Sequence, residues 1–132
     1  YKRLADYYHK SGRRDDATNA YNAALQLAPD DTAARTNLAW LLYLNGQVKE
    51  AITHTLRALK KRPTSRTVFN LGLFYLSNGE IDKAKATYAL AIEQFGAAAG
   101  EEIGAAHNLK SIANRGIQAE VAREILKTYW QQ

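Results

Sequence analysis

Apolar and polar positions follow the spacing of amphipathic helices along this chain, and the same pattern occurs three times. Large apolar residues fall three or four positions apart, as on one face of a helix, and glycine or proline interrupts the pattern at regular intervals. Gly12, Gly46 and Gly79 are separated by 34 and 33 residues. The pattern therefore predicts a series of helical hairpins, each turning at one of these glycines.

Each copy of the pattern has the same eight positions. The first copy reads Leu4-Ala5-x2-Tyr8-x3-Gly12-x4-Ala17-x3-Tyr21-x2-Ala24-x4-Pro29, the second runs from Leu38-Ala39 to Pro63, and the third runs from Leu71-Gly72 to Gly96. The small residue after each leucine lets a neighbouring helix approach closely, and the large residue that follows fills the adjoining space. Because neither helix of a pair can bury its apolar stripe alone, we expect the pairs to stack into a common core.

This pattern resembles the tetratricopeptide repeat family over residues 1–98. The resemblance implies an all-α fold, a right-handed superhelix of stacked antiparallel helical hairpins, in a single domain of residues 1–132. The expected repeats are 1–31, truncated at its N-terminus, 32–64 and 65–98, with a degenerate fourth hairpin or capping helices at 99–132. The family tryptophan is missing, with Arg35 and Val68 near its place, and Thr55 replaces an aromatic residue.

Residues 97–132 continue the helical pattern less regularly. Asn114-Arg115-Gly116 predicts a turn about three residues late relative to the repeat, and a last helix is expected from Gln118 to about Trp130. We interpret this pair of helices as a cap that closes the core against water. The alternatives are a helix that docks on another chain and self-association through Tyr129 and Trp130.

Composition excludes several kinds of chemistry. The chain has no cysteine, so disulfides, thiol nucleophiles and thiolate metal sites are ruled out. His9, His54 and His107 fall in different predicted hairpins, with no triad, metal motif or glycine-rich phosphate loop around them. We therefore expect no enzymatic activity, no catalytic residues, no cofactor and no metal site.

The sequence leaves the cellular compartment open. No stretch approaches the roughly 18 apolar residues of a membrane span, so no membrane insertion is expected of this fragment. A start at Tyr1 instead of methionine suggests a processed or excised piece of a larger, bacterial protein, with other segments outside it. Both the cytoplasm and the periplasm fit.

A second stripe on the first helices of repeats two and three points to partner binding. The resemblance implies that this stripe lines the concave side of the superhelix, where partner peptides lie. Asn37 and Asn70 recur within it, and amides suit a dry core poorly. The alternatives are that the stripe is ordinary core or that the C-terminal helix covers it. The expected groove residues are Asn37, Trp40, Tyr43, Arg66, Phe69, Asn70 and Leu73.

One subtype of the family, the carboxylate clamp, grips acidic peptide tails with lysine, asparagine and arginine side chains. Lys2, Asn37 and Arg66 match it in kind. Asp6 stands where an asparagine belongs and Asn70 where an arginine belongs, which adds a repelling charge and removes a bidentate donor. An apolar or mixed peptide is therefore the expected ligand.

The sequence thus predicts a protein–protein interaction scaffold that binds a peptide or helix of a partner protein in a concave groove. A self-assembly module of a larger complex, associating through the C-terminal hairpin, is the alternative. Nucleic-acid binding ranks last, because one basic cluster does not supply a base-reading pair in every hairpin. That cluster is Arg57, Lys60, Lys61, Arg62 and Arg66, in a chain of net charge +5, and it also fits a helix end that needs cations.

Overall fold

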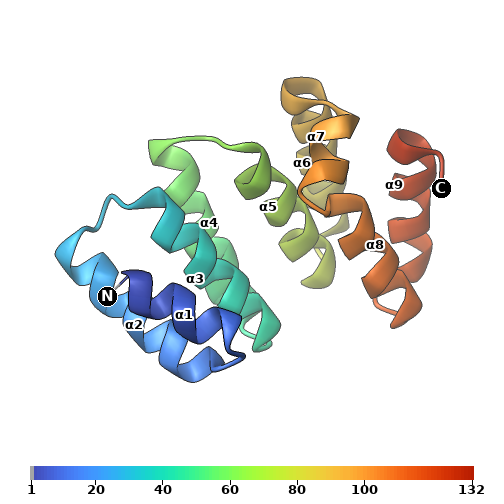
Figure 1. Cartoon of the computed structure of the whole chain (residues 1–132). Helices are drawn as coiled ribbons and strands as arrows, with labels where there is room; N and C mark the ends of the chain where they lie inside the picture. Colours follow the sequence, from blue (N-terminus) through green and yellow to red (C-terminus); the bar gives the residue numbers. More distant parts are fainter. Residues whose placement is uncertain (1) are drawn as a thin grey trace. The chain divides into compact units, whose positions relative to one another are not determined.

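A computed structural model describes residues 2–132, so that Tyr1, the first residue of the predicted first repeat, lies outside the described part. Within the described residues the chain forms nine helices and no strand, which confirms the predicted all-α fold (Figure 1). The helices are α1 (Lys2–Lys10), α2 (Arg14–Leu27), α3 (Thr32–Leu44), α4 (Val48–Lys61), α5 (Ser65–Ser77), α6 (Ile81–Phe95), α7 (Ala97–Glu102), α8 (Ala105–Asn114) and α9 (Ala119–Trp130).

The helices divide into two compact units, Tyr1–Arg62 and Pro63–Gln132. In the first unit α1 packs on α2, α2 on α3, and α3 on α4. In the second unit α5 pairs with α6 and α8 with α9, and the short helix α7 contacts α5, α6 and α8. The helices α3 and α5 begin at residues 32 and 65, where the second and third repeats are expected to start. The grouping of all repeats into one domain of residues 1–132 stays a prediction.

Four turns share one backbone geometry. Each contains a glycine with a φ angle between 76° and 82°, a conformation that glycine adopts without steric cost. The amide of the next residue donates a hydrogen bond to the carbonyl five residues earlier, at 2.8 to 2.9 Å. The pairs are Arg13–Tyr8, Gln47–Leu42, Glu80–Tyr75 and Ile117–Ile112. The expected helix stops at Gly12, Gly46 and Gly79 are confirmed, and the irregular C-terminal pair turns in the same way.

Side chains from the loops begin the first helices of the second and third hairpins. The carboxylate of Asp31 accepts a hydrogen bond from the Ala34 amide at 3.1 Å, and the Thr64 hydroxyl accepts one from the Thr67 amide at 3.2 Å. Each bond satisfies one of the amides that a helix start leaves without an intrahelical partner. Asp31 comes two residues after Pro29 and Thr64 directly after Pro63, and each proline follows the end of the preceding helix.

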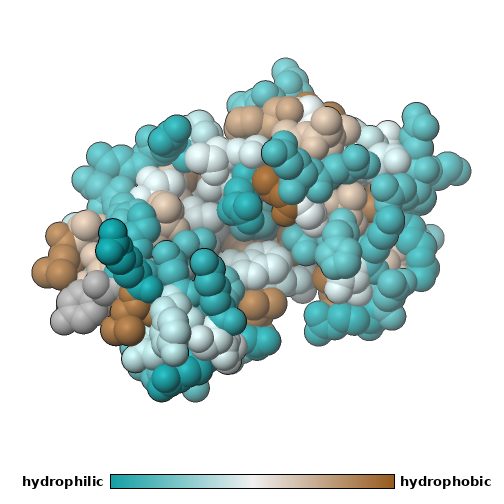
Figure 2. Space-filling view, in the orientation of Figure 1, coloured by the Kyte–Doolittle hydropathy of each residue, from teal (hydrophilic) through white to brown (hydrophobic). Residues whose placement is uncertain are grey.

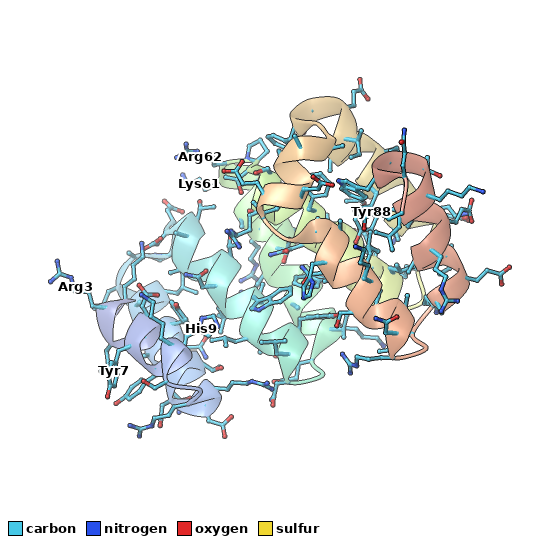
Figure 3. The ribbon with its side chains drawn as sticks, turned by 45° about the vertical axis from the view of Figure 1, so that its right-hand side comes forward. Arg3, Tyr7, His9, Lys61, Arg62 and Tyr88 are labelled. Atoms are coloured by element: carbon cyan, nitrogen blue, oxygen red, sulfur yellow. The ribbon has the colours of Figure 1, made fainter. Side chains whose placement is uncertain are left out.

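Small and large residues interlock inside the third hairpin. A Cβ atom at Gly72 would lie 2.9 Å from Cε2 of Tyr88, so a side chain at this position would collide with the ring. Tyr88 is fully buried and lies among the helices of the second unit (Figure 3). In the second hairpin Thr55 occupies the equivalent position, buried, with its hydroxyl bonded to the Ala51 carbonyl at 2.7 Å. The predicted close approach beside each leucine is therefore present in the third hairpin.

The first hairpin exposes apolar side chains that its successor buries. Leu4 and Tyr7 on α1 are exposed, whereas Leu38 and Leu41, one repeat later on α3, are buried in the first unit. The difference arises because α2 of the first hairpin packs on α3. Among the described residues no helix precedes α1 to cover it in the same way. Leu27 on α2 is exposed as well, and Figure 2 shows brown, hydrophobic patches over the first hairpin.

The last helix of the second unit has one apolar and one polar face. Its buried residues are Ala122, Ile125, Leu126 and Trp130, and its exposed residues include Arg123, Glu124, Lys127 and Thr128. A polar outer face suits a terminal helix that closes a core. The predicted span of this helix, from Gln118 to about Trp130, agrees with α9.

Candidate functional site

The helix α3 presents a partly exposed aromatic face in the first unit. Asn37, Trp40 and Tyr43 recur every third residue and are half-buried, whereas Leu38 and Leu41 on the same helix are buried. The rings of Trp40 and Tyr43 have centroids 5.4 Å apart and planes inclined at 37°. Three of the predicted groove residues therefore gather on one side of α3.

A hydrogen-bonded chain fixes the polar end of this face. The hydroxyl of Tyr21 donates to the carboxylate of Asp6, and the side chain of Asn37 is hydrogen-bonded to the same hydroxyl. Burial, followed by the hydrogen bond and the charge of Asp6, raises the pKa of Tyr21 well above its ordinary value, while Asn37 acts in the opposite direction. The hydroxyl thus stays protonated, and its bonds link α1, α2 and α3.

Two of the positions compared with a carboxylate clamp, Lys2 and Asp6, already have partners within the first unit. The ammonium of Lys2 lies 3.3 Å from the carboxylate of Asp31, and the carboxylate of Asp6 accepts a hydrogen bond from the hydroxyl of Tyr21. Burial acts to raise the pKa of Asp31, but hydrogen bonds from Ala34 and Lys2 outweigh it and lower that pKa. The absence of a complete clamp stays a prediction.

The other predicted groove residues lie in the second unit and differ from an open floor. Phe69 and Leu73 are each only 2% exposed and Asn70 is 9% exposed, whereas Arg66 is exposed. The ring of Phe69 has its centroid 6.0 Å from that of Trp130 and 6.4 Å from that of Tyr88. Phe69 is therefore a core residue of the second unit, covered by the C-terminal helix, which is one of the alternatives that the sequence left open.

The short helix α7 packs against the rings of both Phe69 and Trp130. A Cβ atom at Gly100 would lie 2.6 Å from Cζ2 of Trp130 and 2.9 Å from Cζ of Phe69, so only a glycine lets both rings pack there. The indole N–H of Trp130 donates to the carbonyl of Ala97 at 2.8 Å. The helix α7 stands between the third and fourth hairpins, where the regular repeat has only a loop. The sole sequence signal for it is the replacement of the terminal proline by Gly96.

A basic pocket of about 350 Å³ lies in the first unit, apart from the aromatic face. It is lined by Pro29, Asp30, Thr32, Arg35, Arg57, Ala58, Lys60 and Lys61. Three members of the predicted basic cluster therefore come together with Arg35, which the sequence pattern marks only as a departure from the repeat. Lys61 also lies 3.4 Å from the carboxylate of Asp30, in a solvent-exposed ion pair that adds little stability.

His54 lies beside this pocket and acts as a hydrogen-bond partner of Arg35. Its Nδ1 atom is 3.0 Å from a guanidinium nitrogen of Arg35, and since that guanidinium can only donate, Nδ1 accepts. Burial first, and then the charges of Arg35 and Arg57, lower the pKa of His54, while Glu50 opposes them. The imidazole is therefore neutral at pH 7.

The lowered pKa of His54 predicts a loss of stability in mild acid. Its ordinary value is 6.5, so as the pH falls through about 6.5 the unfolded chain binds a proton before the folded chain does. Stability should fall between that pH and the lower pKa of the folded state, then level off. We expect the urea midpoint, followed by circular dichroism, to drop less between pH 7.5 and pH 5 in His54→Gln than in the unmodified chain. His107→Gln, which changes an exposed histidine, should retain the full drop; equal drops in both variants would contradict the assignment.

The other two histidines, the possible metal ligands and the possible membrane spans complete the description of residues 2–132. His9 is half-buried and His107 is exposed. Within residues 2–132 no three histidine, aspartate or glutamate side chains come together as metal ligands would. None of the helices in this part of the chain has the length and apolar character needed to cross a membrane.

Comparison with known proteins identifies related sequences and folds. Two models of the tetratricopeptide repeat family match residues 2–66 and 65–94. The TPR repeat-containing thioredoxin TTL4 of Arabidopsis thaliana is 29% identical over 85 residues, which are 64% of this chain and 12% of that protein. A tetratricopeptide repeat protein from Parabacteroides merdae is similar in structure, with a TM-score of 0.65 and 18% identity, over 96% of this chain and 57% of that one. The chain therefore spans only a part of either relative.

Proposed function

Since the chain belongs to the tetratricopeptide repeat family, whose repeats mediate protein–protein interactions, we propose that it is a scaffold that binds a peptide or helix of a partner protein. The observation that carries this proposal is the half-exposed pair Trp40 and Tyr43 on α3, beside the fixed amide of Asn37. Aromatic residues of this kind supply large contact areas at interfaces while their polar atoms keep hydrogen bonds. No catalytic role is proposed.

The seven predicted residues contribute in different ways under this proposal. Trp40 and Tyr43 offer apolar surface, and Asn37 offers hydrogen-bonding groups held in place through Tyr21. Arg66 is exposed and supplies a positive charge in the second unit. Phe69, Asn70 and Leu73 support α5 from within the core, so their substitution would act on stability before it acted on binding. The favoured ligand is a segment with an apolar or aromatic anchor.

Peptide selection against the immobilised chain tests the proposal while the partner is still unidentified. Peptides recovered from a random library should bind the unmodified chain, and Trp40→Ala should weaken that binding by about tenfold or more, as truncation of an aromatic anchor does. The matched control is Leu56→Ala, which removes an exposed leucine from α4. This control should leave affinity within about twofold, because it lies outside the α3 face.

Two outcomes would count against the proposal: the first overturns the role of the α3 face, and the second removes Trp40 from it. One is equal affinity of the Trp40→Ala and Leu56→Ala variants. The other is loss of the helical circular dichroism signal in Trp40→Ala, which would make Trp40 a core residue. In that second case Tyr43→Ala provides an independent test of the same face, since Tyr43 is half-buried near the C-terminal end of α3.

Self-assembly through the C-terminal hairpin is less well supported than partner binding. Of the two aromatic residues that suggested it, Trp130 is buried and bonded to Ala97. The exposed side of α9 carries charged residues, which disfavour a large apolar contact. A molar mass by light scattering that rises with concentration would reverse this ranking.

A further inference from the structure

The basic pocket of the first unit carries a charge that the hairpin fold does not require. Among the second helices of the three regular hairpins, α4 has basic residues in its last turn, whereas α2 and α6 have none. The positions of Arg57, Lys60 and Lys61 are occupied by Ala23, Gln26 and Leu27 one repeat earlier, and by Leu90, Glu93 and Gln94 one repeat later. Complementing the end of a helix therefore does not explain the cluster, because α2 and α6 end without cations.

The geometry around Arg35 holds a guanidinium at the wall of this pocket. Arg35 donates to the carbonyl of Pro29 at 3.0 Å and to Nδ1 of His54 at 3.0 Å. These two bonds use two of the five N–H donors of the guanidinium. These bonds fix the orientation of the guanidinium and therefore of its remaining N–H donors. Because the side chain is already held in place, it loses little conformational entropy when those donors bind a ligand.

The charges around the pocket are unbalanced. Four cationic side chains line it against the single carboxylate of Asp30, which is exposed. Burial first, and then the charge of Arg57, lower the pKa of Arg35, while Asp30 opposes this effect. Like charges that repel one another in this way are stabilised when an anion binds between them. Lys61, labelled in Figure 3 at the end of α4, belongs to the same wall.

We propose that this pocket binds a phosphate monoester dianion. A dianion balances the excess charge better than a single carboxylate does, and two guanidinium groups match the oxygens of a phosphoryl group. A volume of about 350 Å³ lies at the small end of ligand pockets, and it admits the atoms attached to the phosphoryl group as well. The N-terminus of α3 is not counted among the ligand's donors, because Asp31 already caps it. The proposal does not depend on the partner-binding role of the α3 face, since the two residue sets are separate.

Nuclear magnetic resonance titration of the whole chain tests this proposal. The probe is a capped glycine–phosphoserine–glycine peptide, compared with its unphosphorylated and glutamate versions and with inorganic phosphate. The phosphorylated peptide should shift the side-chain signals of Arg35 and Arg57 and raise the pKa of His54, which faces Arg35, Arg57 and Glu50. Arg57→Gln, at an exposed position, should weaken binding by about tenfold or more.

The matched control is Arg123→Gln, which removes an exposed positive charge from α9. It should change the affinity by less than about twofold. Tighter binding of the peptide than of inorganic phosphate would support a phosphorylated protein segment as the ligand, and equal binding would support a small phosphate compound. The proposal is overturned if the pocket signals do not move, if both arginine variants weaken binding equally, or if the glutamate peptide binds as tightly. Tighter, steeply salt-dependent binding of a mixed oligonucleotide would also overturn it.

Discussion

Replacing Trp130 with alanine should destabilise the second unit by about 3–5 kcal/mol, the range for deletion of a large buried aromatic side chain. The indole is 7% exposed and packs on Phe69, and its N–H group satisfies the carbonyl of Ala97. Its removal leaves a cavity beside Gly100 and a carbonyl without its donor. Urea denaturation followed by circular dichroism measures the loss, and hydrogen exchange in α5 to α9 assigns it to the second unit.

Two further variants separate the contributions of the Trp130 side chain. Trp130→Phe keeps a ring but loses the hydrogen bond, and it should cost less than the alanine variant. Tyr129→Ala removes the neighbouring aromatic residue, which is half-buried, and should cost about 1 kcal/mol, near the average for a point substitution. If Trp130→Ala were no more destabilising than Tyr129→Ala, the helix α9 would not close the core of this unit.

Replacing Tyr88 with alanine should also cost about 3–5 kcal/mol, because a fully buried aromatic ring is removed from the third hairpin. The ring lies directly against Gly72 on the opposite helix and 6.4 Å, between centroids, from the ring of Phe69. The expected observation is a lower urea midpoint with faster hydrogen exchange in both α5 and α6. Ala89→Gly is a useful comparison on the exposed side of the same helix, where only helix propensity should be lost, at about 1 kcal/mol.

The contact between Gly72 and Tyr88 predicts a change of sign in a double-mutant cycle. In the unmodified chain Gly72→Ala places a methyl group 2.9 Å from Cε2 of a buried ring, and overpacking of this kind costs about 1–3 kcal/mol. With Tyr88→Ala the collision disappears, and Gly72→Ala should stabilise by up to about 1 kcal/mol through its better helix propensity. A Gly72→Ala effect that is the same in both backgrounds would show that the ring does not limit this position.

The regular hairpins can be predicted from sequence because their determinants are local. A glycine at the turn, a proline after the second helix and a capping side chain such as Asp31 act within a few residues of one another. The helices therefore begin and end close to where the repeat predicts. The helix α7 was not predicted as a separate element, because Gly96 marks an interruption but does not determine whether a loop or a helix comes next.

The candidate sites were harder to predict because they depend on contacts between distant segments. Phe69 occupies a position in the repeat at which a groove residue is expected. It is buried because Trp130, at the end of the irregular C-terminal region, packs against its ring on α5. Arg35 and Arg57 come from different helices and lie 22 positions apart in the sequence. The basic residues of α4 are close together in the sequence and can be recognised there, but Arg35 joins them only in the folded chain. Comparing equivalent positions across repeats would have marked the basic residues of α4 as a feature of one hairpin.

The four matching turns allow the local stability of the hairpins to be compared within one molecule. The amides of Arg13, Gln47, Glu80 and Ile117 have the same type of bond to a carbonyl five residues earlier, with nearly equal lengths. Once the intrinsic rates of their sequences are allowed for, differences in exchange among these amides report how readily each hairpin opens. Four protons in one unmodified sample thus give a profile of opening free energies along the chain, and comparing them after addition of a ligand shows which hairpin that ligand holds closed.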